Sequence, residues 1–309
     1  MCRVRLIHWS IARRRPGNRH ARIATARPGR FPATLPTAIF ARPHRSAIIR
    51  SNDAHSENAP NPPLDFRGRV AIVTGAARGL GRAVAERLYE RGASVAVNIR
   101  DASRADALAQ SLGERALSVA GDLAAAGVPD DIVRRTVDRF GRVDILVNNA
   151  AFARSTRFPD LSAQEFRDAL EVNMVAPFLL TKAVLPAMQA QRYGRIINIS
   201  SSAGRMVSTL GGAHYTASKA GLLGLTRASA KELGKFGITV NAVCPGMIDT
   251  ELTREHATPE LLDRLAAGYP VPRLGTAREV ADLICFAASE AAGYITGTSL
   301  DINGGDLMM

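Results

Sequence analysis

The chain has 309 residues, of which 46% are hydrophobic and 22% are charged, and its formal net charge is +12. This length and apolar content allow one domain with a substantial core. Three cysteines without paired or metal-ligand spacing argue against a disulfide framework and a zinc site, and no uncharged apolar run approaches the ~18 residues that span a bilayer. We therefore expect a soluble, cytoplasmic protein without a metal site and without a membrane partner.

The basic charge is concentrated in residues 1–63, which hold twelve arginines, no lysine and only two acids. Their net charge of +10 leaves +2 for the other 246 residues. Only residues 1–63 are basic enough to bind a nucleic acid, and we do not expect a nucleic-acid partner. Eight prolines disfavour a long helix or a central strand here and predict a disordered extension. Three origins remain open: a start called too far upstream in a GC-rich gene, a mitochondrial transit segment, and a functional tail.

From residue 64 the chain alternates short β-branched runs with helical stretches. The first run, RVAIVTG (69–75), precedes a helical stretch at 82–93, and SVAVNI (94–99) follows as the next strand. Further strands are expected at 143–150, 195–201, 238–246 and 298–304, and a helix is expected at 129–141. Apolar strands separated by helical crossovers predict an α/β fold, a doubly wound parallel sheet of the Rossmann type. One domain over residues 64–309 accounts for all of these elements.

A glycine-rich loop, TGAARGLG (74–81), lies between the first expected strand and its helix. Glycine lets the backbone approach a pyrophosphate closely, and free N–H groups at the helix N-terminus then meet its charge. The loop therefore predicts a dinucleotide-binding site that includes Gly75, Arg78, Gly79, Leu80 and Gly81.

The end of the second strand bears on the choice of cofactor, because an acid there binds a ribose 2′-hydroxyl and an arginine binds a 2′-phosphate. Ile99 occupies the position expected for the acid, and Arg100 follows it. Arg78 offers a second cation for charge-assisted pairing, so we expect NADP as the cofactor. Asp101, one or two positions late, keeps NAD possible.

Tyr215 and Lys219 stand four residues apart in the helical stretch AHYTASKAGLLGLTRASAKEL (213–233), so they lie on one helical face. An ammonium beside a phenol favours the phenolate and lowers the tyrosine pKa from its usual value of ~10. The pair therefore predicts an acid/base group, although an isolated YxxxK also occurs on solvated helix faces.

Five motifs occur in order along the chain: TGxxxGxG at 74–81, NNAA at 148–151, serines at 200–202, YxxxK at 215–219 and CPG at 244–246. With this combination the chain resembles the short-chain dehydrogenase/reductase family over residues 66–307. The resemblance implies hydride transfer between a nicotinamide and a carbonyl or secondary alcohol. Within this family the sequence most resembles the β-ketoacyl carrier-protein reductases. Glucose-dehydrogenase-like enzymes of sugars, polyols or ring ketones are the alternative, and a non-catalytic NADP-binding sensor is a remote one.

The resemblance also implies roles for single residues. Tyr215 is expected to be the general acid in carbonyl reduction, Lys219 to lower its pKa and hold the nicotinamide ribose, and Asn173 to steady a water in a proton relay. A serine hydroxyl would bind the substrate oxygen. The family pattern of a serine three residues before the glycine of SSSAG indicates Ser201, whereas a spacing of thirteen residues before the tyrosine indicates Ser202. We adopt Ser201 and leave Ser202 open.

Further expectations concern the cofactor and the partners. The resemblance places additional cofactor contacts at Asp122, Leu123, Asn149, Pro245, Gly246, Ile248 and Thr250, besides Tyr215 and Lys219. Substrate choice would come from the loop at 204–213 and from a mobile helical lid at 251–275. A basic rim of Arg154, Arg157 and Arg205 would meet an acyl carrier. Family members usually form tetramers through helices here at about 163–191 and 215–236, which implies a homotetramer.

Two positions depart from the family pattern, because Ala151 replaces a usual glycine and Asn303 a usual aspartate. Neither departure touches the proton-transfer group. We interpret His214 as a loop residue and Cys244 as a packed thiol, because neither has an evident catalytic partner in the sequence.

Overall fold

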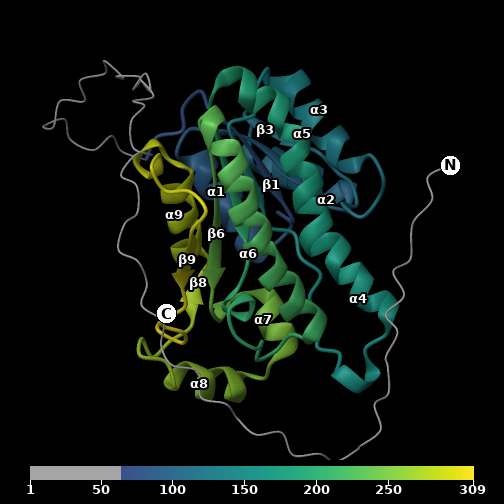
Figure 1. Cartoon of the computed structure of the whole chain (residues 1–309), viewed down its shortest axis with the longest axis vertical. Helices are drawn as coiled ribbons and strands as arrows, with labels where there is room; N and C mark the ends of the chain where they lie inside the picture. The colour runs from purple at the N-terminus through teal and green to yellow at the C-terminus, as the bar shows by residue number, and fades with distance from the viewer. Residues whose placement is uncertain (1–63) are drawn as a thin grey trace, which may run out of the picture. The chain divides into compact units, whose positions relative to one another are not determined.

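The computed structural model describes residues 64–309, so the interpretations of residues 1–63 lie outside the described residues. Residues 64–309 form a seven-stranded parallel sheet with helices on both faces (Figure 1). The strand order is β3-β2-β1-β4-β5-β6-β9. This arrangement confirms the predicted doubly wound α/β fold.

The strands of the main sheet are short and largely buried. They are β1 (Val70–Thr74), β2 (Ser94–Asn98), β3 (Ala116–Ser118), β4 (Ile145–Asn148), β5 (Gly194–Ile199), β6 (Ile238–Pro245) and β9 (Ser299–Ile302). In the register of the sheet Val70 pairs with Ser94, and Ala71 pairs with Ile145. Strand β3 was not predicted, because three half-buried residues are too few to produce a periodic pattern.

Two helical layers cover the two faces of the sheet. One layer contains α1 (Gly79–Glu90), α2 (Ala102–Leu112) and α9 (Ala277–Ala288), and the other contains α3 (Val128–Phe140), α5 (Ala176–Gln191) and α6 (Ala213–Leu233). Alternate strand residues supply two separate cores, so that Ala71 and Val73 pack toward α1 while Ile72 packs toward α3. Helix α1 begins at Gly79, three residues before its predicted start, because two of the loop glycines also form its first turn.

A continuous helical run covers residues 163–191. It consists of α4 (Ala163–Leu170), a π-turn (Glu171–Val175) and α5. One window of 18 residues in this run has a mean hydropathy of 1.3, which by length and composition alone would suit a membrane span, and 39% of it is buried. Leu180, Val184 and Met188 on α5 pack into the core beside α3, which accounts for much of the apolar character.

The chain changes direction across the sheet between β1 and β4. Helix α1 follows β1 onto one face, whereas α5, which follows β4, covers the other face. Such a switch point leaves room for a ligand at the carboxyl ends of the strands. The predicted lid lies at this end of the sheet and consists of α7 (Glu251–His256) and α8 (Pro259–Ala267) (Figure 1). A two-stranded sheet of β7 (Ile248–Asp249) and β8 (Gly275–Thr276) joins the two ends of the lid.

The opposite end of the sheet depends on one buried carboxylate. Asp144, directly before β4, is fully buried and accepts hydrogen bonds from Arg69 Nη1 (3.0 Å), from Arg142 Nε (2.8 Å) and from the Val70 main-chain N–H (2.9 Å). These contacts fix the start of β1 against the start of β4. They therefore set the register of the two strands that carry the glycine loop and its neighbour.

Replacing Asp144 with Asn is expected to lower the free energy of unfolding by about 3 kcal/mol, because two guanidinium groups lose their buried charged partner. Urea denaturation at constant pH measures the change. Asp138→Asn is the matched control, since Asp138 pairs with Arg134 on the exposed side of α3, and it should cost less than about 1 kcal/mol. Equal losses in the two variants would show that the buried network has no special importance.

Candidate active site

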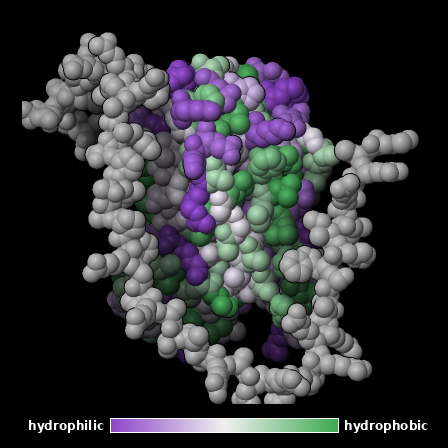
Figure 2. Space-filling model, in the orientation of Figure 1, coloured by the Kyte–Doolittle hydropathy of each residue, from purple (hydrophilic) through white to green (hydrophobic). Residues whose placement is uncertain are grey.

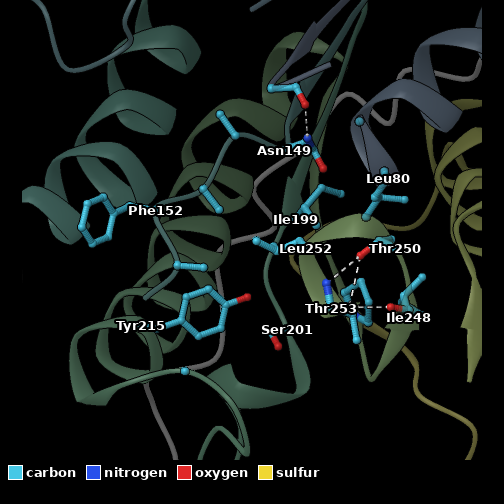
Figure 3. Close-up of a pocket in the computed structure, with 18 of the residues that line it drawn as sticks. Leu80, Asn149, Phe152, Ile199, Ser201, Tyr215, Ile248, Thr250, Leu252 and Thr253 are labelled. Atoms are coloured by element: carbon cyan, nitrogen blue, oxygen red, sulfur yellow. Dashed lines mark hydrogen bonds between the residues drawn. The ribbon is translucent and has the colours of Figure 1, made fainter. Parts of the chain in front are cut away.

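A cavity of about 600 Å³ opens at the switch point, at the carboxyl ends of the strands (Figure 3). Parallel strands end at the same edge of a sheet, so residues far apart in the chain meet there. The lining includes Gly75 after β1, Arg100 after β2, Asp122 after β3, Asn149 after β4, Ser201 after β5 and Gly246 after β6.

The glycine loop is shaped to receive an anion. Gly75 and Gly79 have positive φ angles of 65° and 54°. A Cβ on Gly75 would lie 2.7 Å from Ala150 Cα, and a Cβ on Gly81 would collide with the Gly75 oxygen and with Asn149 Nδ2. Within residues 64–309 no side chain caps the first turn of α1, which leaves its N–H groups free to donate. The loop therefore fits the pyrophosphate of a dinucleotide.

Asn149 fastens the end of β4 to this loop. Its Nδ2 donates to the main-chain oxygens of Thr74 (2.9 Å) and Gly75 (3.2 Å), and its main-chain N–H donates to the Thr74 hydroxyl (3.0 Å). These hydrogen bonds fix the backbone conformation at the start of the glycine loop.

Three arginines, Arg78, Arg100 and Arg104, line the end of the cavity predicted to hold the adenosine. Arg104 was not predicted, because it lies in the first turn of α2, where no motif marks it. Arg78 donates two hydrogen bonds to Glu255 of α7, one of them from Nη2 to Oε2 at 2.9 Å. Asp101, the residue that kept NAD possible, accepts the Arg104 main-chain N–H (3.0 Å) and caps α2. One of its carboxylate oxygens is therefore engaged in the helix cap.

Tyr215 and Lys219 lie one turn apart on α6, and both line the cavity. The Lys219 Nζ lies 5.6 Å from the centre of the Tyr215 ring and donates to the main-chain oxygen of Ile199 (2.7 Å). Lys219 is 2% exposed, and burial lowers its pKa from 10.5 to about 8. The two side chains are therefore close to each other in the cavity.

The effect of this arrangement on Tyr215 differs from the prediction. Burial raises the pKa of the Tyr215 hydroxyl, and the group that acts in the opposite direction is the Ser201 hydroxyl rather than Lys219. The reason is geometric, because the Lys219 ammonium is directed at the Ile199 carbonyl. The phenol is protonated at neutral pH, as a free tyrosine also is, and this is the form that a proton donor requires.

The three serines after β5 occupy different environments. Ser200 is buried, and its hydroxyl donates to the main-chain oxygen of Lys219 (2.9 Å). Ser201 lies beside Tyr215 (Figure 3), and its Oγ accepts the Ala203 N–H (3.1 Å). Ser202 begins a 3₁₀ turn and also lines the cavity. The geometry favours Ser201 over Ser202 as the partner of the Tyr215 hydroxyl.

Asn173 lies in the π-turn and is 1% exposed. Its Oδ1 accepts the Phe152 N–H (2.7 Å), while Nδ2 donates to the Phe152 oxygen (3.0 Å) and to the Ser218 hydroxyl (2.9 Å). Ser218 in turn donates to the main-chain oxygen of Tyr215 (2.8 Å). These contacts occupy the side-chain amide, and the role of Asn173 in steadying a water stays a prediction.

The cavity wall near Tyr215 is largely apolar, and its residues come from the loop after β4 and the two predicted substrate segments. They are Phe152, Met206, Val207, Leu210, Leu252 and Tyr269. Val207 is 79% exposed and Leu252 is 41% exposed, which places apolar side chains in contact with solvent. The sequence indicated the two segments but not their individual residues, because loops have no periodic pattern.

The predicted basic rim is only partly present. Arg205 donates to the Ser299 oxygen (2.8 Å) and lies 3.4 Å from Asp301, with 18% of its side chain exposed. Arg205 is therefore engaged within the fold, and its assignment to a free rim is wrong. Arg154 is exposed and lines the cavity, whereas Arg157 is exposed outside the lining.

The remaining predicted residues fall into two groups. Leu80, Asp122, Leu123, Pro245, Gly246, Ile248 and Thr250 line the cavity, as does Ala151. The interpretation of His214 as a loop residue is wrong, because His214 lies in the first turn of α6 and is fully buried outside the lining, with Nε2 3.8 Å from Glu165 Oε1. Asn303 stabilises a turn through the Gly305 N–H (2.9 Å). Cys244 is fully buried, and burial raises the pKa of its thiol, as expected for a packed residue.

Comparisons with known proteins agree with this geometry. A family model described as enoyl-(acyl carrier protein) reductase matches residues 75–306. The 3-oxoacyl-(acyl-carrier-protein) reductase FabG of Escherichia coli (strain K12) is 40% identical over 246 residues, covering 80% of this chain and 100% of that protein. The FabG protein of Vibrio cholerae is 41% identical with the same coverage. A 3-oxoacyl-(acyl-carrier-protein) reductase of Synechocystis is 41% identical over 245 residues, which cover 78% of this chain and 97% of that protein.

The free energy of unfolding of Lys219→Met, relative to that of the wild type, is expected to be higher at neutral pH than at high pH. The folded pKa of Lys219 is about 8 and its ordinary value is 10.5, so between these values the unfolded chain binds more protons than the folded one. Titration of Lys219 therefore raises the free energy of unfolding of the wild type by about 3 kcal/mol as the pH rises through this window. The unfolding free energy of Lys219→Met minus that of the wild type should fall by this amount from pH 7 to pH 10.5.

Urea denaturation at several pH values measures this difference. Lys231→Met is the matched control, because Lys231 is an exposed lysine on the same helix, and its difference from the wild type should not vary with pH. A flat difference for Lys219→Met as well would contradict the lowered pKa of the buried ammonium.

Proposed function

Because the chain belongs to the short-chain dehydrogenase/reductase family of nicotinamide-dependent oxidoreductases, we propose that it is a reductase of 3-oxoacyl thioesters that uses NADPH. One observation carries this proposal. The hydroxyls of Tyr215 and Ser201 lie together in the cavity, which the glycine loop and an apolar wall also line. A carbonyl bound at that point would face two hydroxyl groups and the nicotinamide end of a dinucleotide.

In the proposed reaction the protein positions the carbonyl and supplies a proton. A bound reduced nicotinamide supplies the hydride that is added to the carbonyl carbon. Ser201 donates a hydrogen bond to the carbonyl oxygen as negative charge develops there, and Tyr215 transfers its phenolic proton to this oxygen. Lys219 holds a ribose hydroxyl through an N–H of its ammonium that is not used by the Ile199 carbonyl.

The preference for NADPH follows from charge at the adenosine end. Arg78, Arg100 and Arg104 line this end of the cavity, and a 2′-phosphate would accept hydrogen bonds from their guanidinium groups. The nearby Asp101 carboxylate, which would favour a free 2′-hydroxyl, takes part in the cap of α2. NADH remains the weaker alternative.

The substrate class follows from the opposite end. The apolar side chains of Phe152, Val207 and Leu252 suit an acyl chain better than a sugar. Relatives with about 40% identity over their whole length are called 3-oxoacyl-(acyl-carrier-protein) reductases. We extend this to a 3-oxoacyl group carried by an acyl carrier protein, with Arg154 at the cavity as a cation for an acidic carrier.

We further propose that the protein is a cytoplasmic homotetramer. The outer surface of α6 carries small exposed residues, Ala217, Ala220 and Ala228, and Phe178 on the neighbouring α5 is 48% exposed. Figure 2 shows weakly polar and apolar residues over the middle of this surface, with hydrophilic residues toward its upper end. Such a surface suits close packing of helices from two subunits.

The first experiment measures oxidation of NADPH and NADH with a panel of substrates. The panel contains one 3-oxoacyl group on an acyl carrier protein, on coenzyme A and on a short thiol, together with a diketone, a ring ketone, an aldose and an enoyl thioester. We expect turnover of the 3-oxoacyl thioesters with NADPH. Tyr215→Phe should reduce kcat by roughly 10³-fold while NADPH still binds, because the proton donor alone is lost.

Other results of this experiment would redirect the proposal. Preferred turnover of the ring ketone or aldose would identify a polyol or ring-ketone dehydrogenase, and preferred turnover of the enoyl thioester would identify an enoyl reductase. NADPH binding without any turnover would favour a sensor. Full activity of Tyr215→Phe would contradict the mechanism.

Ser201→Ala and Ser202→Ala test which serine binds the carbonyl oxygen. Ser201→Ala should lower kcat by about 10²-fold, because it removes a hydrogen bond that strengthens in the transition state. Ser202→Ala is the matched control and should retain kcat within about threefold, since no such bond is lost. The reverse order of the two effects would assign the role to Ser202.

A further inference from the structure

The lid helix α7 brings two carboxylates to the glycine loop. Glu255 accepts both of its hydrogen bonds from the terminal nitrogens of the Arg78 guanidinium. Glu251, one turn earlier on the same helix, places Oε2 3.5 Å from where a Cβ of Gly79 would lie. Acidic groups of the protein itself therefore border the loop that the sequence predicts for the phosphates of a cofactor.

The three arginines at this end of the cavity are not equivalent. In the part of the chain that the structure describes, Arg100 and Arg104 form no ion pair with a carboxylate, whereas Arg78 forms one with Glu255. Arg104 makes only a long contact with the Ala77 oxygen (3.5 Å). The side chains of Arg78 and Glu255 are 42% and 50% exposed, so a ligand can reach the pair from solvent.

We propose that Glu255 is a specificity-determining residue, which competes with the 2′-phosphate of the cofactor for Arg78. The guanidinium presents a planar pair of donors, and this edge cannot bind a carboxylate and a phosphate bidentately at the same time. A 2′-phosphate must therefore displace Glu255 or bind beside its negative charge. A cofactor with a free 2′-hydroxyl leaves the ion pair intact.

This inference rests on the proposed function and deepens it, because it assigns the degree of cofactor preference to the lid. Arg78, Arg100 and Arg104 favour the phosphorylated cofactor, and Glu255 reduces that preference. The same competition links the cofactor to the lid, because displacement of Glu255 removes an ion pair between α7 and the glycine loop. Phosphate binding should therefore loosen α7, whereas binding of the unphosphorylated nucleotide should not.

Calorimetric titration with 2′,5′-ADP and with 5′-ADP tests the competition without turnover. Glu255→Gln should bind 2′,5′-ADP about fivefold more tightly than the wild type does, because an exposed ion pair no longer has to be broken. Its affinity for 5′-ADP should change by less than about twofold. Glu260→Gln is the matched control, because Glu260 is a fully exposed acid of α8 outside the cavity lining, and it should change neither affinity.

Hydrogen exchange of residues 251–256 provides a second measurement. In the wild type, 2′,5′-ADP should increase exchange in this helix relative to 5′-ADP. In Glu255→Gln the two nucleotides should give equal exchange. The gain in 2′,5′-ADP affinity should also shrink as the salt concentration rises, because the groups are exposed to solvent.

The results separate failure of this inference from failure of the proposed function. Wild-type binding of both nucleotides with no change in their affinity ratio in Glu255→Gln would overturn the competition alone. An equal gain for both nucleotides would also overturn it, since Glu255 would then act only on lid closure. A wild-type protein that binds neither nucleotide would overturn the nucleotide site and the proposed function together.

Discussion

The contact between the glycine loop and the end of β4 is the constraint on which the site depends. Gly81 lies so close to the Gly75 oxygen and to Asn149 Nδ2 that no Cβ fits, and the amide of Asn149 holds the backbone on both sides of this contact. The first turn of α1 is thereby directed at the switch point of the sheet. The lining residues that follow β1 to β6 are placed beside this turn, because these six strands end at the same edge of the sheet.

A second set of contacts holds the proton-transfer group at the far side of the cavity. The amide of Asn173 joins the loop after β4 to Ser218, and Ser218 bonds the main chain of Tyr215. Lys219 is held by the end of β5, and the main chain of Lys219 in turn receives the Ser200 hydroxyl. Buried polar groups that are satisfied in this way fix the orientation of α6 against the sheet. The phenol is therefore positioned by main-chain contacts on two sides.

The fold and the outline of the site were readable from the sequence, because both depend on local patterns. Apolar β-branched runs indicated the strands, and the glycines and the YxxxK pair marked the two ends of the cavity. The direction of the Lys219 ammonium could not be predicted, since it depends on the Ile199 carbonyl, twenty residues away at the end of β5. The pairing of Arg78 with Glu255 and of Arg205 with Asp301 escaped prediction for the same reason, as both join segments that are remote in sequence.

The two-stranded sheet of β7 and β8 has a consequence for how such a protein acquires new substrates. It pairs Ile248 with Gly275 and Asp249 with Thr276, so the intervening lid is a loop whose ends are already closed. The entropic cost of a closed loop grows only with the logarithm of its length. Insertions or exchanges between these two anchors therefore disturb the rest of the fold little. The lid sequence can therefore change in evolution while the residues at the carboxyl edge of the main sheet stay unchanged.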